Sequence, residues 1–556
     1  MVSRPTEAAG RLDDGWYPAD GSPLATRIRI LALVGPPLTA ALALVLAWGT
    51  LMPGVGFWDT AEFQAVPPVL GTLHPTGFPA YAVLGWLASI LLQPLGEPAF
   101  RMNVFSAICV AGAVGLTTVL VRQLTGRPVL AIAVGLLLFL TELTWNISTH
   151  ADAHALHLFL LALVIVLLVG WEERASGGRD SDGGPADGPE PVDQRGRAGS
   201  DRWLIAAAAA YGVAVANHSL ALLALPGIGL YVLAVEPGIF GRRGIVLRCL
   251  GAGLGVTALL FLELPLRAGP FRAPIVYGHP ETLSGFLYVV FGQQFGGALV
   301  AAQGTLGARL GGLADLAATQ LGILAPALPF AAAATILRRW RYAILTGPTL
   351  VLTCLFALLY DNADITRYYL GPLLIALTWL AILVDGVVRW GARVFDRAWT
   401  GPAPTGTRSV AALLVLEVAA AAIVLAPATA AADVTRSTVD ESHDTAAAGW
   451  LDTTLRALAP DAVVISWWSF STPLWYARDV EGRRPDITII DDRTRLDENL
   501  GDVPDVIDHY LGRRPVYIIR LANETSVLAE TYELAPLSDA MGSGLARVLR
   551  RRPDAP

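Results

Sequence analysis

Long uncharged apolar runs alternate with short polar segments through the first three quarters of the chain. The runs lie near residues 28–51, 101–121, 128–145, 155–171, 203–217, 218–235, 245–266, 311–337, 342–360, 368–388 and 409–431. A helix that crosses a bilayer needs about 20 apolar residues at a rise of about 1.5 Å per residue. The pattern therefore predicts a mainly α protein, a polytopic bundle of about eleven transmembrane helices spanning residues 28–432.

The pattern changes after about residue 433. Three short β-branched runs follow, DAVVIS (461–466), DITIID (486–491) and PVYIIR (515–520), with helix-like stretches between them at 470–480 and 503–511. Alternating strands and helices predict a small α/β domain with parallel strands over residues 433–556. The residues leave open whether this domain takes part in chemistry or serves as a scaffold.

Composition agrees with a membrane protein, because 54% of the residues are hydrophobic and only 16% are charged, against about 25% charged in soluble domains. The three cysteines, Cys109, Cys249 and Cys354, all lie in apolar runs. No disulfide is therefore available to the C-terminal domain, and we expect buried structural thiols. No feature of the sequence indicates a nucleic-acid partner.

All 40 basic residues are arginine, and their distribution predicts the orientation. With eleven spans, 21 of them lie on the side of the N-terminus, five lie in the opposite loops, and the other 14 follow the last span. Because cytoplasmic loops are rich in basic residues, the N-terminal tail (1–27) is predicted to be cytoplasmic and the C-terminal domain extracytoplasmic. The protein is expected in the cell membrane.

Three further segments complete this organisation. Residues 79–95 contain Pro79, Gly85 and Pro94, which favours a helix that lies at the membrane interface. If this segment crossed the membrane, all later loops would change sides, and the arginine-rich loops would lie outside the cytoplasm. Residues 172–202 are rich in Gly, Pro and Asp, which predicts a disordered cytoplasmic loop. The first apolar run has no small-residue cleavage site, so it is interpreted as a signal anchor.

The first outer loop carries the most informative polar residues. Asp59 and Glu62 are three positions apart, so they share one face of a helix, and His74 follows in a turn fixed by two prolines and a glycine. Charge near lipid is costly, about 2.5–3.5 kcal/mol per group at a span centre. Two alternatives remain open here: a helix start capped by Asp59 and Glu62, and an interfacial loop histidine.

The other outer ends of the predicted spans also carry polar residues. These are His150, Asp152, His154, Asn217, His218, Arg267, Asp361, Asp364 and Arg367. Each alone is compatible with an interfacial cap, and a metal site from His150, Asp152 and His154 lacks a recognised zinc spacing. Together they predict a cavity for a charged headgroup beside a lipid tail. Arginine suits phosphate, and a carboxylate suits a general base for a hydroxyl acceptor.

The motifs WDTAEF, GTLHPTGFPAY and RMNVFSA in residues 58–107 resemble a family of protein O-mannosyltransferases formerly filed as a domain of unknown function. The resemblance continues through VANHSLALLALP, LPLRAGP and TRYYLGP, and through residues 463–490 of the C-terminal domain. The family belongs to the GT-C superfamily, whose members use lipid-phosphate sugars. HADAHAL (150–156) departs from the Glu-Val-Tyr of family members at this place.

The resemblance implies a role for each matching residue. Asp59 corresponds to the catalytic Asp of the first outer loop and Glu62 to the second acid. The residues assigned to substrate binding are His74, Arg101, Asp152, His154, Asn217, His218, Arg267, Arg367 and Tyr368, with Arg267 or Arg367 holding the lipid phosphate.

The resemblance thus predicts an inverting transfer of mannose from a polyprenyl-phosphate donor to a hydroxyl of a protein or glycan acceptor, without a metal or cofactor. Two other classes remain. A transporter or flippase of a lipid-linked sugar would favour paired inverted halves, and no internal repeat is present. A non-enzymatic assembly scaffold gives no reason for Asp59 and Glu62 together.

Overall fold

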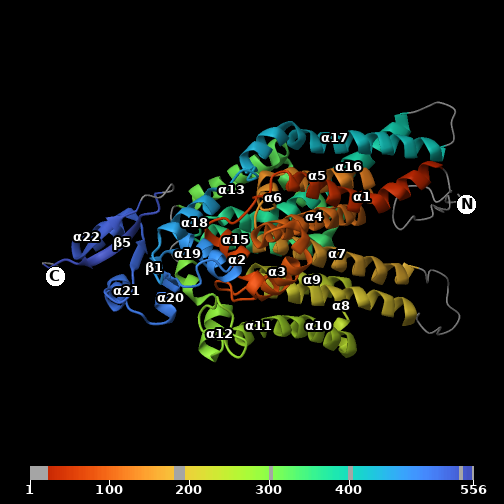
Figure 1. The fold of residues 1–556 in the computed structure, drawn as a ribbon. Helices are drawn as coiled ribbons and strands as arrows, with labels where there is room; N and C mark the ends of the chain where they lie inside the picture. Colours follow the sequence, from red (N-terminus) through yellow and green to blue (C-terminus); the bar gives the residue numbers. More distant parts are fainter. Residues whose placement is uncertain (1–22, 181–193, 300–304, 399–404, 538–541, 554–556) are drawn as a thin grey trace, which may run out of the picture.

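The computed structural model describes residues 23–180, 194–299, 305–398, 405–537 and 542–553. Long helices lie lengthwise beside one another, and a small sheet domain lies at one end of this bundle (Figure 1). The fold is therefore a helical membrane bundle with one appended α/β domain, as the apolar pattern predicts.

Within the described residues, eight helical segments are long and apolar enough to cross a membrane. They are Thr26–Trp48, Pro98–Thr125, Ala153–Ala175, Arg243–Ala268, Leu306–Arg338, Trp340–Leu359, Ile365–Phe395 and Ala412–Val439. Each of the eleven predicted runs contains a helix, but those at 128–140 and 219–235 are shorter and the one ending at Asn217 is less apolar. The number of eleven spans therefore stays a prediction.

Along the chain, the long helices of the bundle are separated by shorter helices. Their bounds are α1 Pro23–Trp48, α2 Trp58–Ala65, α3 Pro79–Leu91, α4 Pro98–Thr125, α5 Pro128–Leu140, α6 Glu142–Asn146, α7 Ala153–Asp180, α8 Gln194–Asn217, α9 Leu225–Val235, α10 Arg243–Phe261, α11 Glu263–Ala268, α12 Leu283–Val290, α13 Leu306–Leu321, α14 Leu328–Arg338, α15 Trp340–Leu359, α16 Leu370–Ala398 and α17 Thr405–Val439. Short 3₁₀ helices join them, including η1 Pro67–Val69, η2 Gln93–Leu95, η3 Ser219–Ala224 and η7 Ile365–Tyr369.

Two connecting segments, residues 172–202 and 79–95, were predicted as a disordered loop and as an interfacial helix. The loop predicted at 172–202 is helical at both flanks, because α7 continues to Asp180 and α8 begins at Gln194; residues 181–193 lie outside the described part. Residues 79–95 form α3 and η2, and α3 leaves Leu87 and Leu91 exposed. Its place at the membrane interface stays a prediction.

The C-terminal domain is built on a five-stranded sheet in the order β2-β1-β3-β5-β4. Strands β1 (Val463–Ser466), β2 (Thr488–Ile490) and β3 (Val516–Ile519) are parallel, as predicted, whereas β5 (Leu545–Arg551) and β4 (Tyr532–Pro536) add an antiparallel edge. The helices of the domain are α18 Ala446–Ala457, α19 Trp468–Trp475, α20 Asp492–Asp497, α21 Val503–Tyr510 and α22 Ala522–Thr531, with a π-helix at Tyr476–Val480.

The domain is packed directly against the first outer loop. Phe57 contacts the rings of Trp450 and Phe470 with centroid distances of 5.7 and 5.5 Å. The Tyr476 hydroxyl accepts a hydrogen bond from the backbone N–H of Ala99, at the start of α4, at 3.1 Å. This docking packs α19 against α2, the helix that carries the acidic residues of the loop.

Candidate active site

The local backbone of the first loop aims Asp59 into the molecule. Phe57 is extended and Trp58 has a left-handed φ of 56°, a strained conformation for a large residue. The Trp58 ring is held against Trp467 of the C-terminal domain at 5.0 Å. Asp59 lies inside the first turn of α2, and no side-chain hydrogen bond caps that helix. The capping alternative is therefore wrong for Asp59, and its carboxylate is available for other contacts.

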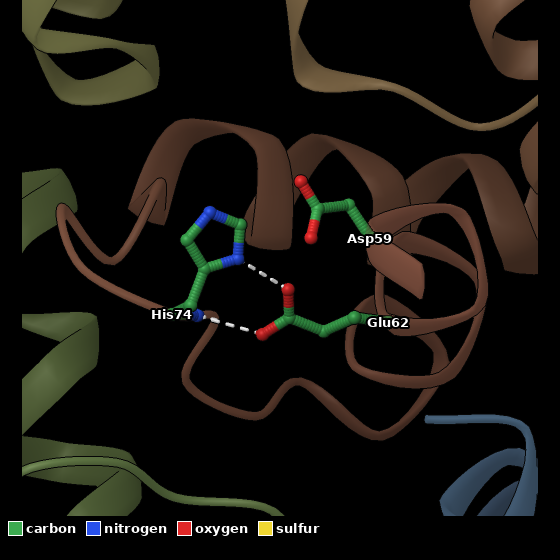
Figure 2. A group of neighbouring side chains, drawn as sticks. All are labelled: Asp59, Glu62 and His74. Carbon is green, nitrogen blue, oxygen red and sulfur yellow. Dashed lines mark hydrogen bonds and ion pairs between the residues drawn. The ribbon is translucent and has the colours of Figure 1, made fainter. Parts of the chain in front are cut away.

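Glu62 and His74 are joined to each other by two contacts, next to Asp59. One Glu62 oxygen, Oε1, accepts the backbone N–H of His74 at 2.7 Å, and Oε2 lies 2.5 Å from the His74 Nδ1 (Figure 2). Glu62 is fully buried, whereas His74 is partly exposed. These two contacts fix the imidazole in one orientation, with Nε2 directed away from Glu62.

The turn that carries His74 depends on a close backbone approach. Thr72 donates its N–H to the Ile275 carbonyl at 3.0 Å, and a Cβ on Gly71 would lie 2.6 Å from the same oxygen. Only glycine fits at such a distance. The 267–279 segment thus supports the position of His74.

Arg367 joins two carboxylates that are far apart in the sequence. Its Nη2 donates to Asp59 Oδ2 and its Nη1 donates to Asp152 Oδ2, both at 2.9 Å. The other oxygen of Asp59, Oδ1, accepts the indole N–H of Trp468 at 3.0 Å. The Asp59 carboxylate is therefore held by a guanidinium from η7 and an indole from α19.

These contacts set the charge of the loop residues. Burial alone would raise the pKa of Asp59, but the charges of His74 and Arg367 hold that pKa below its usual value. Burial raises the pKa of Glu62. Burial alone would lower the pKa of His74, but the Glu62 carboxylate beside it raises that pKa. These shifts favour an ionised Asp59 and a proton on the Glu62–His74 pair.

A second cluster of polar side chains begins at Asp152 and extends into the bundle. Its Oδ1 lies 2.9 Å from the His154 Nδ1, and the His154 ring lies 4.6 Å from His218 and 5.1 Å from Tyr368. Asn217 donates to the Ala153 carbonyl at 3.1 Å. Within the described residues, His154 Nε2 and Asn217 Oδ1 are buried without a hydrogen-bond partner, which is typical of a site that receives a polar ligand.

The structure brings together nine of the eleven residues predicted for the site: Asp59, Glu62, His74, Asp152, His154, Asn217, His218, Arg367 and Tyr368. The other two are engaged with backbone carbonyls. Arg101 donates to Gly96 and Ser89, and Arg267 donates to Leu70 and Val69. Their predicted substrate roles stay untested. Arg267 holds the backbone at the end of η1, and Arg101 holds the backbone between α3 and α4.

The group Asp59, Glu62 and His74 offers one ligand atom each within 4.8 Å of one another, so it has the composition of a metal site. Its atoms are already engaged, because Arg367 and Trp468 hold Asp59 and His74 is bound to Glu62. In the alternative set of His150, Asp152 and His154, His150 pairs instead with Glu441 at 3.2 Å.

Trp468 was missed by the sequence reasoning. It is 409 positions away from its partner Asp59, and nothing local distinguishes it from Trp467. The one available signal is the consecutive pair of tryptophans directly after a buried strand, at the end of a parallel sheet where ligands gather.

Comparison with known sequences agrees with the motif resemblance. Residues 59–237 match the family model described as the Protein O-mannosyl-transferase TMEM260 N-terminal domain. The mouse (Mus musculus) Protein O-mannosyl-transferase TMEM260 is 26% identical over 299 residues, which cover 51% of this chain and 37% of the mouse protein. The chain thus spans little more than a third of the length of this curated relative.

Solved structures share the whole architecture. ArnT from Cupriavidus metallidurans bound to undecaprenyl phosphate superposes with a TM-score of 0.55 at 14% identity, covering 92% of this chain and 97% of ArnT. The apo state of the same protein gives a TM-score of 0.55 at 15% identity. At this identity the likeness shows a shared fold alone.

Proposed function

We propose that this chain is a membrane glycosyltransferase of the GT-C type, because residues 59–237 match the TMEM260 O-mannosyltransferase model and the fold is similar to that of ArnT. It transfers a sugar, mannose by family resemblance, from a polyprenyl-phosphate donor to a hydroxyl of a protein or glycan. The observation that carries the proposal is the Asp59 carboxylate in the first outer loop, held by Arg367 at 2.9 Å.

In the proposed reaction the Asp59 carboxylate accepts the proton of the acceptor hydroxyl. The acceptor oxygen forms a bond to C1 of the donor sugar from the face opposite the phosphate. The bond between C1 and the phosphate oxygen breaks, and the polyprenyl phosphate leaves with the electron pair. One displacement of this kind inverts the configuration at C1, and the base contributes about 10²–10⁴-fold to the rate.

We propose that the donor phosphate binds beside Arg367 and His154. Arg367 is the arginine nearest to Asp59, and its Nε–H is without an acceptor among the described residues. Guanidinium groups bind phosphate oxygens through charged hydrogen bonds. The solved ArnT structure with undecaprenyl phosphate supports a lipid-phosphate ligand for this fold.

We also propose that the reaction needs no metal ion and takes place on the outer face of the membrane. The three side chains with metal-ligand geometry are engaged by Arg367, Trp468 and one another. Before residue 432, 21 arginines lie in segments on the side of the N-terminus and five lie in the opposite loops, which favours a cytoplasmic position for the N-terminal side.

The test is sugar transfer by the purified protein in detergent, with radiolabelled polyprenyl-phosphate-mannose and membrane-extract acceptors, with and without EDTA. We expect Asp59→Asn to lower kcat by about 10²–10⁴-fold while donor binding persists. Asp433→Asn, a substitution of an exposed carboxylate in α17, is the control and should retain full activity.

The other outcomes are equally informative. Equal transfer by wild type and Asp59→Asn would remove Asp59 from the chemistry, and loss of activity with EDTA would contradict metal independence. Donor binding without transfer, for mannose and for other sugars, would favour a transporter of lipid-linked sugars.

A further inference from the structure

The C-terminal domain reaches the reaction centre through one side chain. Trp468, the first residue of α19, donates its indole N–H to Asp59 Oδ1 at 3.0 Å, while Arg367 holds Oδ2 at 2.9 Å. A carboxylate presents about four lone-pair positions. With one donor on each oxygen, the plane of the carboxylate is fixed, and a lone pair remains for the acceptor hydroxyl.

The Trp468 ring is itself held by its surroundings. It contacts the rings of His74, Tyr277 and Trp475 at 5.8 Å each. Tyr277 belongs to the membrane bundle and Trp475 to the same domain as Trp468. An indole N–H can only donate, and packing on three sides directs this donor at Asp59.

We propose that Trp468 is a positioning residue for glycosyl transfer: the C-terminal domain completes the active site by orienting the Asp59 carboxylate toward the acceptor hydroxyl. This inference rests on the proposed function. It assigns the C-terminal domain a part in the chemistry in place of the scaffold role that the sequence left open.

The neighbouring tryptophan supplies a matched control. Trp467 contacts the rings of Trp58 and Phe470 at 5.0 and 5.6 Å, and its Nε1 has no hydrogen-bond partner among the described residues. Trp467→Phe and Trp468→Phe therefore remove the same atoms at adjacent positions. Only Trp468→Phe removes a hydrogen bond to Asp59.

The first measurement is the pH dependence of kcat/KM for the full-length protein. The Trp468 hydrogen bond favours the ionised form of Asp59, so its loss makes the carboxylate easier to protonate. We expect Trp468→Phe to move the acidic limb of the profile upward by about one pH unit. We also expect it to lower kcat about tenfold with a donor KM within about twofold of wild type. Trp467→Phe should leave the profile and kcat unchanged.

A second measurement does not depend on activity. Thermal unfolding of Asp59→Asn, Trp468→Phe and the double variant should be non-additive, with a coupling of about 2–4 °C in Tm. The same cycle with Trp467→Phe should be additive. Additive effects of the Asp59 and Trp468 substitutions would overturn the inference whether or not the protein transfers sugar.

An active Trp468→Phe variant with the wild-type pH profile would overturn it as well, as would an equal shift in Trp467→Phe. Absence of transfer by the wild type, with Asp59 and Trp468 energetically coupled, would instead count against the proposed function, so the two failures are distinguishable.

Discussion

At the scale of the residue, the site separates two kinds of acid. Asp59 is held by donors from Arg367 and Trp468, which favour its charged form, whereas Glu62 is fully buried and pairs with His74. Paired carboxylates with different surroundings commonly have different roles. The arrangement favours Asp59 as the group that meets the acceptor, and Glu62 as the group that orients His74.

The Glu62–His74 pair predicts a pH-dependent stability. The pKa of His74 is raised in the folded protein, so the stabilisation by the protonated pair is complete below about pH 6.5 and is lost as the pH rises through the raised pKa. Glu62→Gln removes the charge that holds this proton and should cost about 2 kcal/mol at low pH. The difference in Tm from wild type should be largest below pH 6.5 and should shrink above it.

Thermal unfolding in detergent between pH 5.5 and 8.5 checks this prediction. Glu530→Gln, at an exposed position of α22, is the control and should follow the wild type throughout. A Tm difference that grows with rising pH would contradict the proposed charge state of the pair.

The sequence predicts the first-loop residues because they lie within 16 positions of one another and in one motif. It does not predict which arginine joins them, because Arg267 and Arg367 look equivalent along the chain. The structure separates them: Arg267 donates to backbone carbonyls, and Arg367 bridges Asp59 and Asp152. Trp468 could not be predicted either, because its partner Asp59 lies 409 positions away in the sequence.

At the scale of the element, the far end of the bundle is joined by buried charges. Asp385 of α16 accepts from Arg127 at 3.1 Å and from Arg389 at 2.9 and 2.8 Å. Arg338 of α14 lies 3.2 Å from the same carboxylate. Asp385 is therefore the common anion through which α14, α16 and the start of α5 are held together.

Asp385→Asn should be strongly destabilising. Removing one partner from a buried ion pair leaves uncompensated charge and costs about 3–5 kcal/mol. We expect a clear fall in Tm in detergent. Asp433→Asn, an exposed carboxylate in α17, should change Tm little. Equal Tm values for the two variants would show that the arginines find other partners.

Element prediction succeeded where periodicity and composition were strong, as in the long apolar helices and the three β-branched strands. It failed for β4 and β5, because YELAP and LARVLRR mix charged and apolar residues. β5 pairs with β3, and the edge strand β4 pairs with β5, so strand pairing and not local preference decides their conformation. The flanks of the 172–202 loop became helical because they continue α7 and α8.

At the scale of the whole molecule, the two ends of the bundle have different functions. One end carries the site and the docked sheet domain (Figure 1). The other end carries the buried Asp385 network and most of the arginines that belong to the bundle. If the positive-inside rule applies, these ends lie in different compartments.

Cysteine labelling tests this orientation. In a variant without Cys109, Cys249 and Cys354, a cysteine at Arg513 in the C-terminal domain should react with a membrane-impermeant maleimide in intact cells. A cysteine at Gly238, in the open turn between α9 and α10, should react only after permeabilisation. The reverse pattern would invert the proposed topology.

The contact between Trp468 and Asp59 has a spectroscopic consequence. Indole emission depends on the charges beside the ring, and this indole lies next to an ionised carboxylate and edge-on to an imidazole. When the sugar donor or the acceptor substrate binds between these groups, it changes the electric field at the Trp468 indole. The protein therefore contains its own optical reporter of site occupancy, whose signal among the 15 tryptophans is isolated by subtracting the spectrum of Trp468→Phe.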